Sequence, residues 1–89
     1  MTTYEKCNFQ LYGHTGWVYS FETIHNDVLC SGSSDHSIRT WDIEETICDK
    51  VLLGHEGLVS CLIYNDAKGV LLSGSHDHQI HFWDTRLKN

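Results

Sequence analysis

Short runs rich in β-branched and aromatic residues alternate along the chain with turn-forming clusters. "WVYSFET" and "LVSCLIY" contain the Val, Trp, Tyr, Phe and Ile side chains that strands favour. "HND" and "NDAKG" interrupt them, as Asn, Asp and Gly do in tight turns. The later runs "VLCSGS", "IRTWD", "TICDKVLL", "VLLSGS" and "IHFWD" continue the alternation. Together with "EKCNFQLY" near the N-terminus, they predict eight short antiparallel strands and no helix.

The whole strand pattern occurs twice. "GSSDHSIRTWD" (residues 32–42) recurs as "GSHDHQIHFWD" (residues 74–84), with seven of the eleven positions identical. "GHTGWV" likewise recurs as "GHEGLV". The second copy is one residue longer because of an insertion in a turn, where a repeated structural unit tolerates it. The chain therefore divides into two repeats, which we place at residues 4–42 and 45–84.

These repeats resemble the WD-repeat β-propeller family. The similarity consists of Gly-His followed by Ser-Gly-Ser-x-Asp-x-x-Ile-x-x-Trp-Asp, twice, and it covers roughly residues 4–84. The spacing agrees with the ~40–45 residues expected for one propeller blade. The resemblance implies an all-β fold with two four-stranded antiparallel blades of a WD-repeat propeller.

The resemblance also implies a hydrogen-bonded group of four side chains in each blade, here called a tetrad. A buried indole N–H, a hydroxyl, an imidazole and a carboxylate can form a chain that satisfies every member. Loss of one member leaves the others buried and unpaired, which is costly. The first tetrad comprises His14, Ser31, Asp35 and Trp41, and the second comprises His55, Ser73, Asp77 and Trp83.

Composition and charge exclude several classes of partner. With 89 residues, 40% of them hydrophobic and 20% charged, the chain is typical of one small globular domain. The net charge of −6 provides no basic surface for nucleic acid or for an anionic membrane. The N-terminal stretch has no apolar signal core, and the apolar runs are too short to span a bilayer, so we expect a cytoplasmic or nuclear protein. The four scattered cysteines form no C-x-x-C pair, so we expect free thiols and no cofactor.

Two sequence features invite a catalytic interpretation. The tetrads contain the Ser, His and Asp of a hydrolase triad, but no G-x-S-x-G motif accompanies them, so we predict no enzyme. The alternative is a metal-dependent hydrolase that uses His76, His78 and His81, since three imidazoles can hold Zn²⁺. Residues 78 and 81 are an odd number apart and should face opposite sides of a strand, which favours surface histidines and no metal site.

The family resemblance implies where protein partners bind. They are expected on the face that carries the Gly-His loops and the turns with the tetrad aspartates. The candidate partner-binding residues are Thr15, Trp17 and Ser34 in the first repeat and Glu56, Leu58 and His76 in the second. Trp17 is the favoured anchor because aromatic side chains dominate many interfaces. It could equally pack against the next blade or line the central channel, because one sequence does not assign strand faces. The predicted function is a protein–protein interaction scaffold or adaptor.

Two repeats do not make a closed propeller, which needs ~4–8 blades. The order of the strands, with an outer strand first, predicts that another copy of the chain completes the last blade. Head-to-tail association would then form a homo-oligomeric ring, with six blades from three chains or eight from four. The alternative is that the chain is a non-autonomous fragment of a longer propeller.

Overall fold

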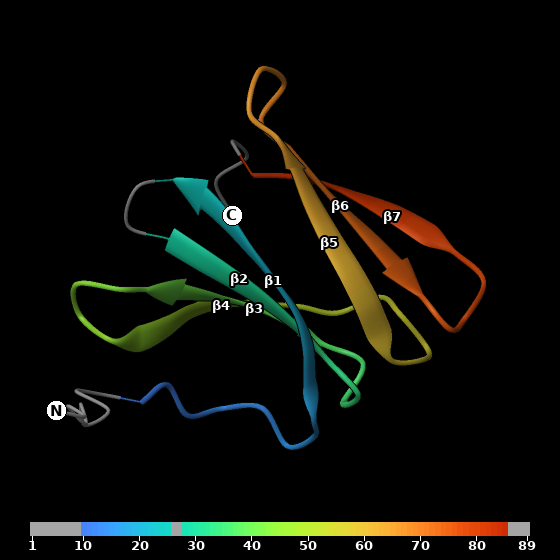
Figure 1. The fold of residues 1–89 in the computed structure, drawn as a ribbon, viewed down its shortest axis with the longest axis horizontal. Coiled ribbons are helices and arrows are strands. Elements are labelled where there is room, and N and C mark those ends of the chain that lie inside the picture. Colours follow the sequence, from blue (N-terminus) through green and yellow to red (C-terminus); the bar gives the residue numbers. More distant parts are fainter. Residues whose placement is uncertain (1–9, 26–27, 86–89) are drawn as a thin grey trace, which may run out of the picture.

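The computed structural model describes residues 10–25 and 28–85. The elements in these residues are seven strands and no helix, and Figure 1 shows them as two twisted sheets. The strands are β1 (Val18–His25), β2 (Val28–Ser33), β3 (Ile38–Asp42), β4 (Ile47–Leu52), β5 (Val59–Asn65), β6 (Val70–Ser75) and β7 (Ile80–Asp84). The predicted all-β class is confirmed. No helix long and apolar enough to cross a membrane occurs in the described part of the chain.

Each sheet is an antiparallel meander. The first sheet has the order β1-β2-β3-β4 and the second has the order β5-β6-β7. The first strand of the second repeat, β4, completes the first sheet as its outer strand. The predicted eighth strand, over residues 5–12, falls largely outside the described residues, and residues 10–12 form no strand. Within the described residues, the second sheet therefore contains three strands rather than the predicted four.

The β2–β3 and β6–β7 turns are shaped by their own side chains. In each turn the aspartate Oδ1 accepts the backbone N–H two residues later, from Ser37 to Asp35 and from Gln79 to Asp77, both at 2.9 Å. This bond is that of an Asx-turn, and it holds each aspartate in the turn that follows β2 or β6. The residue between each pair is a histidine with positive φ, 73° at His36 and 71° at His78.

The hydrophobic core lies between the two sheets. Strand β5 packs against β1 and β2, as Figure 1 shows. The buried core side chains are Ile24, Cys30, Ile38, Val59, Leu62 and Leu71. Burial of this apolar surface is the main force that holds the two sheets together.

At Gly32 the two sheets approach each other closely. A methyl group at this glycine would lie 2.6 Å from Val59 Cγ1 and 2.6 Å from Ser20 Oγ. Val59 is fully buried, so its side chain has little space to move. Only glycine allows β5 to pack this close to β2.

Glu22 forms the polar link between the sheets. Its carboxylate accepts the backbone N–H of Thr23 at 2.9 Å and that of Tyr64, in β5, at 3.1 Å. The neighbouring Cys30 thiol is fully buried, and burial, with a smaller contribution from the Glu22 charge, raises its pKa to about 12. Cys30 is therefore a packing residue rather than a nucleophile.

The outer faces of the two sheets remain uncovered, and the repeat itself provides the comparison. On the inner face of the first sheet, Ile38 is 0% and Thr40 5% exposed, whereas the equivalent Ile80 and Phe82 of the second sheet are 69% and 72% exposed. On the outer face of the first sheet, Phe21 is 66% exposed, although the equivalent Leu62 of the second sheet is buried. Each sheet thus buries one apolar face and leaves the other in solvent.

The close approach at Gly32 predicts a large loss of stability for Gly32→Ala. The added methyl group forces Val59 or the β2 backbone to move, and overpacking of this kind costs ~1–3 kcal/mol. Gly74→Ala is the matched control, because within the chain a methyl group there would meet only the Sγ atom of the exposed Cys61 at 2.7 Å. Both variants also carry Phe82→Glu, which keeps any other copy of the chain away from Gly74. Denaturant unfolding of both variants measures the difference. An equal loss at both positions would contradict the assigned contact between the sheets.

Candidate functional site

The first tetrad is a continuous chain of hydrogen bonds across the sheet. Trp41 Nε1 donates to Ser31 Oγ at 2.7 Å, and Ser31 Oγ lies 2.6 Å from His14 Nε2. His14 Nδ1 lies 2.8 Å from Asp35 Oδ2. The chain joins β3, β2, the loop before β1 and the β2–β3 turn, so it fixes the loop and the turn against the sheet.

The second tetrad repeats this geometry. Trp83 Nε1 donates to Ser73 Oγ at 2.8 Å, and Ser73 Oγ lies 2.7 Å from His55 Nε2. His55 Nδ1 lies 2.8 Å from Asp77 Oδ2. The structure therefore brings together all eight residues that the sequence assigned to the two tetrads, four in each sheet.

One arrangement of protons satisfies every member of a tetrad. With the imidazole proton on Nδ1, the histidine donates to the aspartate and accepts the serine O–H at Nε2. The serine oxygen in turn accepts the indole N–H. Ser31 and Ser73 are 3% and 1% exposed and commit both their proton and their oxygen to these bonds. Neither serine is available as a nucleophile, unlike the serine of a hydrolase triad.

The tetrad aspartates are held in their ionised form. Burial alone would raise the pKa of Asp35, but hydrogen bonds from the Ser37 hydroxyl, from His14 and from two backbone N–H groups lower it well below its usual range. The two backbone donors are Ser37 and Thr15, the latter at 3.0 Å. The carboxylate thus organises the turn and the loop as well as the imidazole.

Asp77 has the same role with one donor fewer. Burial would raise its pKa, but hydrogen bonds from His55 and from the backbone N–H groups of Glu56 and Gln79 lower it well below the usual range. In the first repeat the Ser37 hydroxyl adds a bond to Asp35 at 2.6 Å, whereas the second repeat has Gln79 there. The sequence analysis did not identify the role of Ser37.

The predicted partner-binding residues lie at one end of the sheets. Figure 1 shows the loops into β1 and β5 and the β2–β3 and β6–β7 turns together at this end, here called the loop end. Of the six candidates, four are exposed and two are half-buried. The exposed ones are Thr15, Trp17, Glu56 and His76, and the half-buried ones are Ser34 and Leu58. Their role in binding remains a prediction.

Trp17 is held more firmly than its counterpart in the second repeat. Its backbone N–H donates to Ser34 Oγ at 2.8 Å, and its carbonyl accepts the Ser34 N–H at 2.8 Å. In the second repeat the Leu58 carbonyl accepts the His76 N–H at 3.1 Å. Between Leu58 and His76 there is no counterpart of the bond from the Trp17 N–H to the Ser34 hydroxyl. The Trp17 side chain is nevertheless 76% exposed.

Tyr19 accompanies Trp17 and was missed by the sequence analysis. The two rings lie 6.3 Å apart between centroids with an interplanar angle of 53°, and Tyr19 is 46% exposed. The available signal was the spacing of two residues, because side chains at i and i+2 share one face of an extended strand. The second repeat has Leu58 and Ser60 at these positions, so the aromatic pair is particular to the first repeat.

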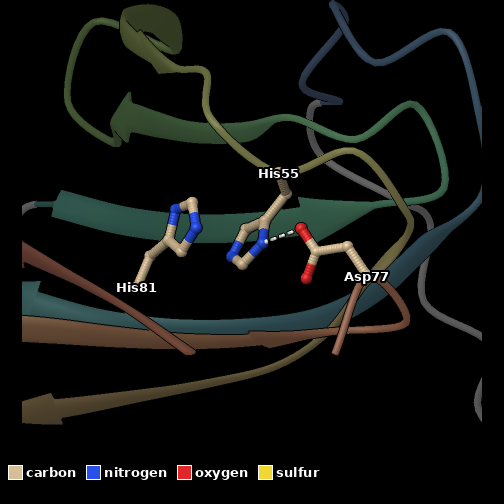
Figure 2. Close-up of side chains that lie close together, drawn as sticks. All are labelled: His55, Asp77 and His81. Atoms are coloured by element: carbon tan, nitrogen blue, oxygen red, sulfur yellow. Dashed lines mark hydrogen bonds and ion pairs between the residues drawn. The ribbon is translucent and has the colours of Figure 1, made fainter. Parts of the chain in front are cut away.

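The structure does not bring His76, His78 and His81 together as metal ligands. His78 lies in the positive-φ turn position, whereas His81, in β7, stacks on His55 with ring centroids 3.9 Å apart and planes 19° apart. Within the described residues, the group of side chains close enough to share an ion is His55, Asp77 and His81, drawn in Figure 2.

This second group is poorly arranged for an ion. His55 already uses Nδ1 for Asp77 and Nε2 for Ser73. His81 Nε2 lies 2.9 Å from Gln79 Oε1. The two imidazole planes are nearly parallel, as Figure 2 shows, so their in-plane lone pairs do not converge on one point between the rings. A metal ion here would have to break the tetrad.

Comparison with protein families gives two matches in this chain. The sequence profile of the family "WD domain, G-beta repeat" matches residues 5–42 and 46–84. The two matches cover most of the chain and correspond to the two repeats recognised in the sequence.

Similar proteins include several named for WD repeats or for the F-box. Cell division control protein 4 of Saccharomyces cerevisiae is 38% identical over 74% of this chain, which spans 8% of that protein. F-box/WD repeat-containing protein 10 of Mus musculus is 41% identical over 56% of this chain, and the match spans 5% of that protein. Among solved structures, the computationally designed Ika4 protein superposes with a TM-score of 0.73 at 26% identity, covering 83% of this chain and 44% of that one.

The lowered pKa values of the tetrad aspartates predict acid sensitivity. A carboxylate whose pKa is lower in the folded state stabilises the fold above its unfolded pKa of ~4, and this contribution is lost as the pH falls below that value. We therefore expect the free energy of unfolding to fall steeply between about pH 4 and pH 2. Urea unfolding across this range measures the slope.

Two variants assign the acid sensitivity to a residue. Ser37→Ala removes one hydrogen bond to Asp35 and should reduce the slope, since it weakens the lowering of the Asp35 pKa. Asp49→Asn, in β4, removes an exposed carboxylate and should leave the slope unchanged. A slope that is the same in wild type and Ser37→Ala would contradict the role assigned to Asp35.

Proposed function

We propose, since the chain belongs to the WD-repeat family, that it is a non-enzymatic module that binds other proteins through its loop end. The observation that carries this proposal is how the tetrads use their side chains. Each tetrad commits a serine, a histidine and an aspartate to structural hydrogen bonds. The same bonds fix the loops, whose other side chains project into solvent.

The projecting side chains differ between the repeats, although the tetrads do not. Thr15 corresponds to Glu56, Trp17 to Leu58, and Ser34 to His76. A rigid frame with variable exposed residues supports a recognition surface, because loops whose backbones are already fixed lose little conformational entropy on binding. Aromatic side chains such as Trp17 are also frequent anchors of interfaces.

The names of the relatives support membership of a multi-protein assembly. One relative, at 36% identity over 66% of this chain, is named a probable E3 ubiquitin ligase complex SCF subunit and comes from Emericella nidulans. The chain spans 9% of that protein. We propose by analogy that this chain also acts as a binding subunit and not as the catalyst of an assembly.

We further propose that copies of the chain cover the two uncovered faces. The inner contact already joins the face bearing Ile38 and Gly32 to the face bearing Val59 and Leu71. The second sheet exposes the face equivalent to that of Ile38 and Gly32. The first sheet exposes the face equivalent to that of Val59 and Leu71. Val18 of one copy would therefore sit over Gly74 of the next. Three or four copies would complete a ring of six or eight blades.

The outer face of the first sheet offers space for a larger neighbour. A hollow of about 220 Å³ there is bordered by Val18, Phe21, Leu29 and Trp41. In the first sheet, the residue equivalent to Phe82 is the smaller Thr40, which is 5% exposed. Between copies the outer face of the first sheet would meet Phe82, whose greater volume needs such a hollow.

Light scattering with two charged variants tests the ring. The wild type should be a discrete trimer or tetramer, whereas Phe21→Glu and Phe82→Glu should each be unable to close it. Each variant keeps one intact face, so an equimolar mixture should form a 1:1 heterodimer. A monomeric wild type, or variants that give no heterodimer, would overturn head-to-tail assembly.

Site-specific photocrosslinking tests the binding function. Photoreactive benzoylphenylalanine replaces Trp17 in one sample and Glu56 in another, and the same protein should be trapped from a lysate of the source cells at both positions. The control replaces Ile47, which is 57% exposed and lies in β4 after the β3–β4 turn, at the opposite end from the loop end. Equal trapping at position 47, or trapping at neither loop position, would contradict the proposal.

A further inference from the structure

We infer that Trp17 and Tyr19 receive a lysine or arginine side chain from a basic segment of a partner protein. The inference rests on the proposed binding function and specifies the chemistry of the partner. Its supporting observations are the geometry of the ring pair, the rigidity of its backbone and the charge of the loop end.

The two rings form a platform suited to a cation. A cation attracts the face of an aromatic ring when it lies within ~6 Å of the ring centroid. The Trp17 and Tyr19 centroids are 6.3 Å apart, so a cation seated over the gap lies within this range of both rings. Both side chains are exposed, so a ligand can reach the pair without any rearrangement of the core.

The platform is fixed before a ligand arrives. The two hydrogen bonds between Trp17 and Ser34 anchor the backbone of the tryptophan. Gly16 allows this approach, because a methyl group there would lie 2.4 Å from Ser34 Oγ. The tetrad fixes the next residue, Asp35, in turn. Little backbone entropy therefore remains to be lost on binding.

The loop end carries a net negative charge. Its segments, residues 13–17, 33–37, 54–58 and 75–79, contain no lysine or arginine and three carboxylates: the exposed Glu56, and Asp35 and Asp77, which are bound within the tetrads. Arg39, which enters β3 just after the turn, places one guanidinium beside Gly13, where it donates to Cys48 Sγ at 3.6 Å, so the three carboxylates outnumber it. Carboxylates with aromatic rings favour a basic ligand and disfavour a phosphorylated or acidic one.

The platform borders the contact of the proposed ring. That contact uses the flat faces of the sheets, where Phe21 and Phe82 lie, and includes Val18, whereas Trp17 precedes β1 at the loop end. Charge favours another protein over a second copy, since a basic segment complements the net charge of −6 whereas a copy of this chain repeats it.

Nuclear magnetic resonance with defined peptides tests this inference on the full chain. The probe is acetyl-Ser-Gly-Arg-Gly-Arg-Gly-Ser-amide, and its counterpart carries citrulline, the neutral analogue of arginine, at both arginine positions. The indole N–H signal of Trp17 should shift saturably with the arginine peptide. The citrulline peptide should bind about two- to fivefold more weakly, as expected for a cation–π contact at an exposed site.

The repeat provides matched variants. Trp17→Leu and Tyr19→Ser introduce the residues of the second repeat, and each should reduce arginine-peptide binding to the level of the citrulline peptide. The indole signals of Trp41 and Trp83, which donate to the tetrad serines, report that each variant remains folded. With Trp17→Leu, the binding is followed by calorimetry because the reporter is lost.

Three results of the peptide experiment would overturn the inference. They are equal binding of the arginine and citrulline peptides, equal binding of a glutamate counterpart, and arginine binding that persists in folded Trp17→Leu. A shift of the Trp17 signal on concentration of the protein alone would mean that another copy covers the platform, which also overturns it. Photocrosslinking at position 17 to a partner segment that is not basic would also overturn the inference. The proposed function of binding other proteins would still hold.

Discussion

The hydrogen-bond chain from tryptophan through serine and histidine to aspartate is the interaction on which the rest of the structure depends. It connects residues far apart in sequence, such as His14 and Asp35, and it is made almost without solvent. In such surroundings each bond is strong and each lost partner is costly, so the four residues behave as one unit. This unit holds the loop and the turn at the end of each sheet in place. The backbones of Trp17 and Ser34 are held in place because they adjoin it.

The tetrads and most strands could be predicted because their signals are local and occur twice. The turn chemistry of Asp35 and Asp77 and the β-branched runs appear at matching places in both copies. The exposure of Trp17 could not be predicted, because it depends on which face of β1 meets the other sheet. A period of two identifies two faces and does not say which is covered. The stacking of His81 on His55 was equally hidden, since the first repeat has Arg39 there.

The two repeats share a frame but differ in how they complete their packing. The contact between the sheets buries the hydroxyls of Ser20 and Thr40, for which the described residues provide no hydrogen-bond partner. The corresponding residues of the second sheet are Cys61 and Phe82, which avoid this penalty. The contact within the chain is thus less apolar than the face that the second sheet presents outward. Glu22 partly offsets the difference through its bond to the Tyr64 N–H.

The position of Cys30 makes the thiol chemistry of the protein depend on how often the sheets separate. The thiol lies at the contact between the sheets, and its high pKa leaves almost no thiolate at neutral pH. An oxidant or an alkylating agent can therefore reach it only during a transient opening of the contact between the sheets. Cys61 is exposed in the folded state and needs no such opening. The two thiols of one chain would therefore react at rates set by different quantities. The rate at Cys61 depends on the reagents in the solvent, and the rate at Cys30 depends on how often the core opens.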